Sequence, residues 1–221
     1  MKYLYCLFGL LLLSACSSDT ISTDSPLEAE GTDSLQAVQE EPQHKGNRQT
    51  TDTTDVKAAF KKFFATLQAS DTVRLNELIH PGEGVWVIEQ PGAVPQMTHL
   101  QDITQFKRHF KSRSFFTVAD EIQQCILQEE NWPTFDCADM DGCNSGYSKD
   151  GCFIFDPTKF QQSGYWNYAG LSDKQVQRVK STLPLLQKSV LHTRTSFEFH
   201  FGVVDGHWRL LFAKLIYPCS A

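Results

Sequence analysis

The residues best suited to chemistry are three cysteines and two aspartates in one loop-like stretch, namely Cys137, Asp139, Asp141, Cys143 and Cys152. Zinc sites commonly pair cysteines separated by two residues, and that spacing does not occur here. A calcium-binding loop begins with an acidic ligand and has glutamate at its twelfth position, where this stretch has cysteine and serine. Aspartates beside glycine more often form turns. We therefore predict no metal site in this stretch and expect its cysteines to form disulfides.

Catalytic and cofactor motifs are not recognisable elsewhere in the sequence. It has no Gly-x-Ser-x-Gly turn, no phosphate-binding glycine loop and no His-Glu-x-x-His pattern. A cysteine nucleophile needs a base beside it, and the sequence places none there. His99, Asp120 and Tyr165 are polar groups that a pocket could contain, but their spacing does not bring them together. We predict no catalytic residue and no cofactor.

An aromatic cluster is the best candidate for contact with a ligand or a partner. It contains Tyr165, Trp166 and Tyr168. Aromatic rings with polar tips suit the faces of sugars and peptides. The same composition also suits a half-buried packing edge, so both interpretations stand.

The N-terminus has the pattern of a secretory signal, with Lys2, an apolar run through Leu13, and small residues before Cys16. The run is too short for a finished membrane-spanning helix. Its end, Leu-Ser-Ala-Cys, resembles the lipobox of bacterial lipoproteins. The resemblance implies that residues 1–15 are a signal peptide, cleaved before a Cys16 that then carries lipid. The alternative is an ordinary signal peptide with an incidental cysteine.

Export changes how the other cysteines are interpreted. If Cys6 leaves with the signal and Cys16 is lipidated, five thiols remain, and these can form at most two disulfides. Disulfides persist in the oxidising compartments that exported proteins reach. The sequence does not select the pairs, but we favour one bridge within the loop that contains Cys137, Cys143 and Cys152.

Composition divides the exported chain into a tether and a domain. Residues 17–54 contain no Phe, Trp or Tyr, so they cannot bury enough apolar surface to fold. We predict a lipidated, disordered tether over 16–54 and a single globular domain over 55–221. The chain has a formal net charge of −6, which argues against nucleic acid as a partner. No second apolar run is long enough to span a membrane.

Hydrophobic spacing predicts helices in the first half of the domain. Apolar residues from Val56 to Leu67 recur at helical spacing. Asp71 caps a second, shorter helix, and residues 85–88 form a short strand. A third helix over 99–110 ends in a basic cluster, which we interpret as a solvated helix end. The cluster comprises Lys107, Arg108, His109, Lys111 and Arg113.

The second half of the domain is predicted to contain more strand. Residues 114–128 have strand-like apolar runs, and another strand begins at Cys152. Ser172 opens a helix with a capping box, and this helix ends or kinks near Pro184.

The last stretch has the clearest pattern, because apolar residues alternate on both sides of the dipeptide at 205–206. That dipeptide, Asp-Gly, is favoured in tight hairpin turns. A two-residue turn would place three pairs on one face and Trp208 in the main core. The three pairs are Val203 with Trp208, Phe201 with Leu210, and Phe199 with Phe212.

This order of elements resembles the nuclear-transport-factor-2-like superfamily. The resemblance covers residues 55–128 and 195–217, and its motifs are Asp71 and the Asp-Gly-His-Trp-Arg sequence at 205–209. It implies an α+β fold in which a curved antiparallel sheet wraps around helices as a cone and leaves a pocket. A cysteine-rich loop and an extra helix at 172–188 depart from this pattern, so another α+β arrangement is the alternative.

We therefore predict a membrane-anchored lipoprotein of the bacterial cell envelope whose domain binds a partner protein or a small ligand. Ser17 and Ser18 follow Cys16 without an aspartate, which by analogy with known sorting favours the outer membrane, and we expect its periplasmic face. Enzymes of the superfamily include steroid isomerases and epoxide hydrolases. The alternative is thus an isomerase or hydrolase that acts on a small apolar substrate. A bound small molecule with converging carboxylate and hydroxyl groups would favour the enzyme, whereas a cone filled by side chains, with an exposed apolar sheet face, would favour the binding module.

Overall fold

A computed structural model describes residues 53–141 and 144–219. The predicted signal peptide, the lipidation site Cys16, the tether up to residue 52 and Cys143 lie outside these described residues. Helix α1 (Thr53–Gln68) begins two residues before the predicted start of the domain.

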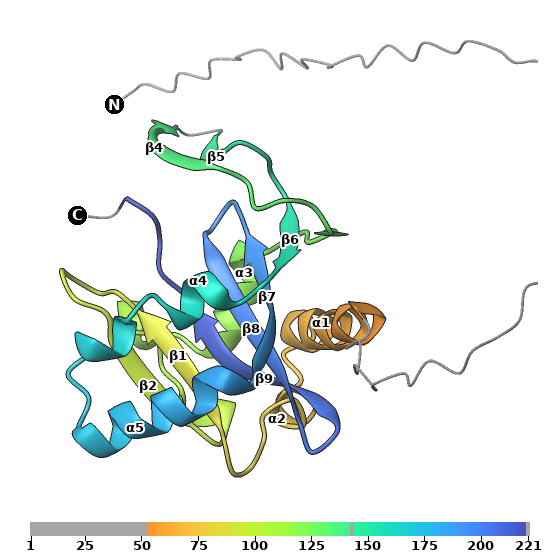
Figure 1. Ribbon diagram of the computed structural model, residues 1–221. Helices are drawn as coiled ribbons and strands as arrows, with labels where there is room; N and C mark the ends of the chain where they lie inside the picture. The colour runs from red at the N-terminus through yellow and green to blue at the C-terminus, as the bar shows by residue number, and fades with distance from the viewer. Residues whose placement is uncertain (1–52, 142–143, 220–221) are drawn as a thin grey trace, which may run out of the picture. The chain divides into compact units, whose positions relative to one another are not determined.

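Within the described residues, seven strands form one curved, mostly antiparallel sheet in the order β2-β1-β9-β8-β7-β6-β3 (Figure 1). The neighbours β1 and β9 are parallel, and so are β3 and β6. The mixed α+β class predicted from the sequence is confirmed. The strands are β1 (Val85–Glu89), β2 (Gln96–Leu100), β3 (Leu127–Gln128), β6 (Cys152–Phe155), β7 (Leu186–His192), β8 (Phe197–Val204) and β9 (His207–Lys214), with β4 (Phe135–Met140) and β5 (Ser145–Tyr147) forming a separate ribbon.

Alternation along β1 divides the core into two layers, one on each face of the sheet. Val85 and Val87 belong to the layer that contains α1 and α2, whereas Trp86 and Ile88 belong to the layer that contains α4 and α5. The other helices are α2 (Thr72–Asn76), α3 (Val118–Glu121), α4 (Thr158–Gln161) and α5 (Asp173–Thr182), with 3₁₀ turns at Ile103–Gln105, Phe110–Ser112, Phe115–Thr117, Tyr165–Asn167 and Leu183–Leu185.

Four phenylalanines fill the layer between α1 and the sheet. Phe60 and Phe63 on α1 pack against Phe199 and Phe201 on β8, and the ring centroids of Phe63 and Phe199 are 4.8 Å apart. Each of the four side chains is at most 2% exposed. The space between α1 and the curved sheet is therefore packed with side chains.

The second layer covers the opposite face with α4, the turn that follows it, and α5. Phe160, Trp166 and Val179 from these elements are buried with Trp86 and Phe212 from the sheet. The ring centroids of Phe160 and Phe212 are 5.1 Å apart. Because both faces are covered, the central strands contribute apolar residues in both directions.

Local capping explains where the predicted helices begin. The side chain of Asp71 accepts a hydrogen bond from the backbone N–H of Arg74 at 3.0 Å, which confirms it as the cap of α2. The backbone N–H of Ser172 donates to the side chain of Gln175 at 3.0 Å, so the predicted capping box of α5 is also confirmed. Helix α5 ends at Thr182, which agrees with the predicted early end near Pro184. The predicted extent to residue 188 is wrong, because Leu186–His192 form β7.

The terminal hairpin β8–β9 is confirmed, and near the turn its register is the predicted one. Val203 pairs with Trp208, and Phe201 pairs with Leu210. The prediction that Trp208 lies inside the core is wrong, because its side chain is only half-buried and packs against the first layer from outside. A hollow of about 440 Å³ beside α1 and α2 leaves one side of the indole open.

Beyond the turn, a bulge changes the register of the hairpin. The irregularity lies between His200 and Phe201. As a result Phe212 pairs with His200, and Phe199 pairs with Ala213, so the predicted pairing of Phe199 with Phe212 is wrong. A bulge adds one residue to one strand, which moves the following side chains to the other face. Phe212 therefore lies in the second layer and not in the first.

The predicted helix over 99–110 is wrong. His99 belongs to β2, where strand pairing places it opposite Trp86 on β1. The side chain of Asp102 then caps a 3₁₀ turn, and Phe110 is 63% exposed. Pairing with β1 holds residues 99 and 100 in a strand, and two separate 3₁₀ turns replace the rest of the predicted helix.

Residues 114–128 contain less strand than predicted. The hydroxyl of Ser114 accepts a hydrogen bond from the backbone N–H of Phe116 at 3.2 Å and caps a turn that leads into α3. This capped turn buries Phe115 and Val118 without a sheet ladder. Only the two residues of β3 join the sheet.

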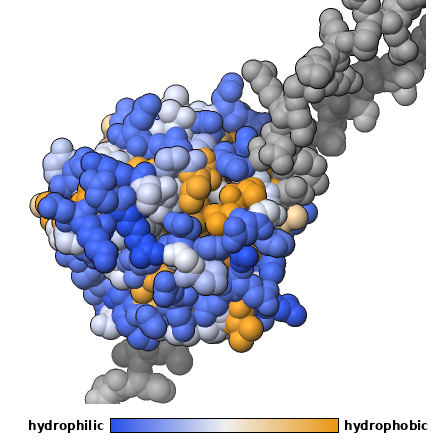
Figure 2. Space-filling model, turned by 60° about the horizontal axis from the view of Figure 1, so that its bottom comes forward, coloured by the Kyte–Doolittle hydropathy of each residue, from blue (hydrophilic) through white to orange (hydrophobic). Residues whose placement is uncertain are grey.

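The domain surface carries few large apolar groups. The face shown in Figure 2 is largely hydrophilic, with apolar residues in small patches. The exposed large apolar side chains include Val73, Ile126 and Tyr168. Among the described helices, none has the length and apolar character needed to cross a membrane.

Candidate functional site

Two disulfides link distant parts of the described chain. They are Cys125–Cys152 and Cys137–Cys219. The prediction of disulfides is confirmed. The predicted bridge within the loop is wrong, because Cys137 and Cys152 are each bonded to a cysteine outside it. The first bridge follows from the parallel pairing of β3 with β6, which brings the chain just before β3 next to the start of β6. Thiols that are far apart in sequence become neighbours through such pairing.

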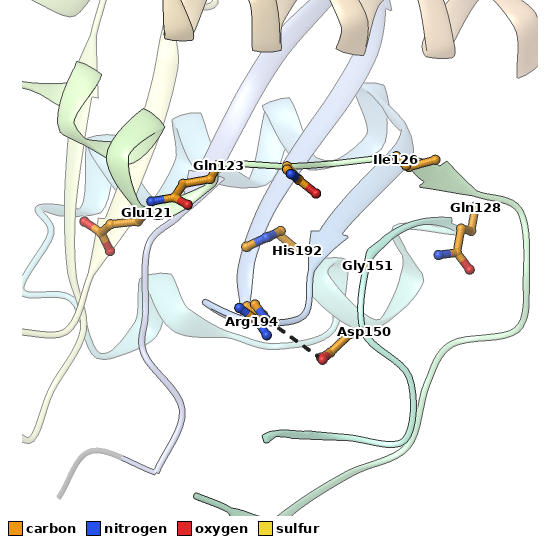
Figure 3. A pocket seen from close by; sticks show the side chains of 9 residues that line it. Glu121, Gln123, Ile126, Gln128, Asp150, Gly151, His192 and Arg194 are labelled. Carbon is orange, nitrogen blue, oxygen red and sulfur yellow. Dashed lines mark ion pairs between the residues drawn. The ribbon is translucent and has the colours of Figure 1, made fainter. Parts of the chain in front are cut away.

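A polar cavity of about 650 Å³, here called the edge pocket, lies beside the Cys125–Cys152 bridge (Figure 3). One wall is the segment that leads from α3 into β3, and the other is formed by the end of β7 and the turn before β6. Because each wall contains or adjoins one cysteine of the bridge, the disulfide fixes their separation. The polar lining residues are Gln123, Gln124, Gln128, Asp150, His192 and Arg194.

Gly151 lies in the wall of the edge pocket formed by the turn before β6. Its φ is +141°, a value that residues with a side chain rarely adopt. Its backbone N–H donates to Oγ1 of Thr193 at 2.9 Å. A Cβ atom at this position would lie 2.6 Å from Nε2 of Gln128 and would displace the end of that side chain. The backbone conformation of the turn therefore favours glycine.

The charged groups of the edge pocket compensate one another. Asp150 accepts a hydrogen bond from the hydroxyl of Ser145 at 2.7 Å and lies 4.0 Å from Arg194. Glu121, at the end of the pocket, is paired with Arg108 behind it. The pocket thus offers amide, carboxylate and guanidinium groups with little net charge. Such a lining suits a ligand that presents hydrogen-bond donors and acceptors, such as peptide groups.

His192 is an uncharged member of this lining. Its side chain is 5% exposed, and its Nδ1 lies 2.8 Å from Oγ1 of Thr195. Burial, together with the charge of Arg194, lowers the pKa of His192 to about 4. At neutral pH the imidazole is therefore neutral and acts as a hydrogen-bonding group. A base with so low a pKa accepts protons poorly at that pH.

The basic cluster at 107–113 contains a feature that the sequence did not reveal, and its interpretation as a solvated helix end is wrong for Arg108. That side chain is 2% exposed, its Nε lies 3.2 Å from Glu89, and its other nitrogens bond to Glu121 and Tyr217. Burial disfavours the charged guanidinium, but the hydrogen bond with Tyr217 and the charge of Glu121 outweigh it and raise the pKa of Arg108. The partners come from distant parts of the sequence, so no local pattern predicts the cluster.

A serine and a histidine are also paired in the second layer. Oγ of Ser189 lies 2.6 Å from Nδ1 of His200, and Oε2 of Glu198 lies 3.6 Å from Nε2 of the same ring. These residue types can form a hydrolytic nucleophile. However, Ser189 and His200 are 0% exposed, and Phe160 stacks on the imidazole with centroids 3.7 Å apart. Burial holds the pKa of His200 well below its usual value. No substrate reaches this serine while the layer is packed.

The three polar residues considered for a pocket have separate surroundings. Nε2 of His99 lies 2.7 Å from the carbonyl oxygen of Glu83, beside a hollow of about 860 Å³ between β2 and α5. Asp120 is exposed on α3. Nζ of Lys214 lies 5.5 Å from the ring centroid of Tyr165, on the side of the second layer. The structure shows no contact that would join them in one site.

The aromatic cluster lies at the margin of the second layer. Trp166 is 7% exposed and belongs to that layer, and Tyr165 packs against it. Tyr168 is 69% exposed. Of the three, Tyr168 presents the most surface to a ligand or partner, and such a contact stays a prediction.

Taken together, these observations define an α+β domain with a polar, disulfide-bounded pocket at one edge of its sheet. Compared with models of protein families, with curated proteins and with solved structures, the chain matches none. In residues 53–141 and 144–219, no group of three or more His, Cys, Asp or Glu side chains is arranged to hold a metal ion. Function is therefore argued from the geometry of the domain.

Proposed function

We propose that this chain is a lipid-anchored protein of the bacterial cell envelope whose domain binds a partner protein at the edge pocket. The lipobox-like sequence ending at Cys16 supports the anchor. The two disulfides are compatible with an oxidising compartment outside the cytoplasm. The serines after Cys16 favour the outer membrane, and we propose its periplasmic face.

The observation that carries the binding role is the packed space between α1 and the sheet. We infer a nuclear-transport-factor-2-like arrangement in which Phe60, Phe63 and Phe199 occupy the place of a substrate cavity. An enzyme that worked inside such a cone would need that space for its substrate. A polar pocket lies instead at the edge of the sheet, where a partner can reach it. This distribution supports recognition over catalysis.

The anchor is tested by changing the cysteine that would carry lipid. We expect Cys16→Ala to move the protein from the detergent phase to the aqueous phase in detergent partitioning, because acyl chains supply the membrane affinity. Its thermal unfolding should match that of the wild type. Ser17→Ala, which keeps the cysteine, should stay in the detergent phase. Unchanged partitioning of Cys16→Ala would contradict the proposed anchor.

The binding role is tested in cells that produce the full chain, with a photo-crosslinking amino acid placed at Gln124 in the edge pocket. We expect a discrete adduct from this position and none from Gln162, an exposed glutamine at the end of α4. Adding Arg194→Glu on the opposite wall should remove the adduct, whereas Lys180→Glu on α5 should leave it. Binding at this pocket would be contradicted if Arg194→Glu left the adduct unchanged. It would also be contradicted if the control position gave as much adduct as position 124.

A further inference from the structure

Resting on the proposed binding role, we propose how the partner binds: an extended segment of it adds as a strand to the edge of the sheet along residues 123–128. In this arrangement the partner's backbone hydrogen-bonds to the exposed edge. Its alternate side chains enter the hollows on the two sides of that edge, and its acidic residues face the lysines of α1. The chemistry recognised is that of an extended, acidic peptide with alternating apolar residues.

The first observation is the free backbone of this segment. Strand β3 is last in the sheet order and pairs only with β6. In Figure 3 the chain runs nearly straight from Gln123 to Ile126 and continues into β3. Among the described residues, no backbone–backbone hydrogen bond outside the β3–β6 ladder involves residues 123–126. The edge therefore presents N–H and C=O groups to an incoming strand.

The second observation is that the edge lacks the usual protection. Exposed edges are commonly blocked by charged side chains, proline or a bulge. The sequence at 123–128 is Gln-Gln-Cys-Ile-Leu-Gln, which has no charge and no proline. Ile126, at its middle, is 78% exposed. A short uncharged edge with an exposed apolar residue is suited to pairing with another chain.

The third observation is that the segment separates two hollows of different character. The glutamines of the segment line the edge pocket, which is polar. Cys125 and Leu127 line an apolar hollow of about 340 Å³ against Phe60 and Phe64 of α1, and Ile126 borders both hollows. Side chains of a strand alternate between two sides, so an added strand would direct every second residue to each hollow. Backbone bonds with alternate side-chain pockets are the elements of recognition by strand addition.

Charge indicates which extended segment fits. Lys57 and Lys61 border the apolar hollow. Lys57 is paired with Glu129 at 2.7 Å, whereas Lys61 has no ion-pair partner among the described residues. Residues 123–128 supply no acidic side chain, and Glu129 and Glu130 after them are already paired with Lys57 and Lys149. Two copies of this chain pairing edge to edge would therefore leave Lys61 without a partner. An acidic segment of a different protein complements it.

The first experiment measures whether the partner's backbone makes the bonds. Random twelve-residue peptides displayed on phage are selected against the purified full chain in detergent micelles, and the tightest peptide is synthesised with single N-methyl groups along its length. We expect a period of two, in which methylation of every second amide weakens binding at least tenfold and methylation of the others less than threefold. Loss without this period, insensitivity to methylation, or failure to select any peptide would overturn the proposal.

The second experiment changes the edge itself. Leu127→Pro removes an N–H that faces away from β6 and should weaken the selected peptide at least tenfold more than Leu127→Ala, which keeps the N–H. Lys61→Glu should weaken the peptide at least fivefold, with Lys180→Glu on α5 as the unaffected control. Equal binding by the proline and alanine variants would overturn strand addition, and the N-methyl series decides the matter if the proline variant unfolds.

Two further outcomes keep this proposal separate from the binding role. An adduct from Gln124 that requires Arg194, combined with an N-methyl series lacking the period of two, would leave the edge pocket as the binding site but overturn strand addition. A dimer in sedimentation that disappears in Leu127→Pro would assign the edge to a second copy of this chain and overturn the choice of partner.

Discussion

Replacing Arg108 by alanine should destabilise the protein by about 3–5 kcal/mol, because it leaves buried carboxylates without their counter-charge. Arg108 is 2% exposed and Glu89 is 7% exposed, so water cannot replace the lost partner without opening the core. Denaturant unfolding measures the change. Lys107→Ala, in the same basic cluster but exposed, should cost less than about 0.5 kcal/mol and is the matched control.

A double variant shows whether the cost comes from the unpaired charge. Arg108→Met combined with Glu89→Leu removes both members of the most buried pair, and it should recover part of the stability that Arg108→Met alone loses. Glu121 and Tyr217 still bond to each other in the double variant. If Arg108→Ala cost no more than Lys107→Ala, the guanidinium would not be buried in solution.

Replacing Phe63 by alanine should cost about 3–5 kcal/mol, because it opens a cavity at the centre of the first layer. Its ring is fully buried and lies 5.8 Å from that of Phe60 and 4.8 Å from that of Phe199 between centroids. A loss of this size is comparable with the whole stability of many domains, so the variant is measured first by near-ultraviolet circular dichroism and then by urea unfolding.

The control for Phe63 is Phe110→Ala, because Phe110 is 63% exposed and outside both layers. It should shift the unfolding midpoint only slightly. Similar small shifts for both variants would mean that the space between α1 and the sheet is not packed, and would restore the case for a cavity there. The pair of variants therefore tests the observation on which the binding role depends.

Local chemistry made some elements predictable from the sequence. The stripe of α1, the Asp71 cap, the capping box at Ser172 and the turn of the terminal hairpin depend on residues close together in the chain. Each of these elements can be recognised from the spacing of its apolar residues or from a side chain that bonds to the nearby backbone. For these elements the tertiary structure and the local preference agree.

The errors occurred where distant residues decide the structure. The segment 99–110 has helical spacing, but its first two residues pair with β1, and Phe212 changes face because of a bulge that no turn rule predicts. Arg108 is buried because Glu89 and Tyr217 reach it from other elements. The edge pocket depends in the same way on the parallel pairing of β3 and β6. No single-sequence pattern contains these contacts.

The connectivity of the disulfides has a consequence for how the chain matures. In chain order the bridges cross, because Cys137 lies between Cys125 and Cys152 but is bonded to Cys219. A chain oxidised in the order of its synthesis would first join Cys125 to Cys137, and that pair must be exchanged before either final bridge can form. If oxidation follows the order of synthesis, maturation requires thiol–disulfide exchange after Cys219 is available, and an oxidant alone would leave a wrongly bridged population. The protein is thus expected to depend on a disulfide isomerase.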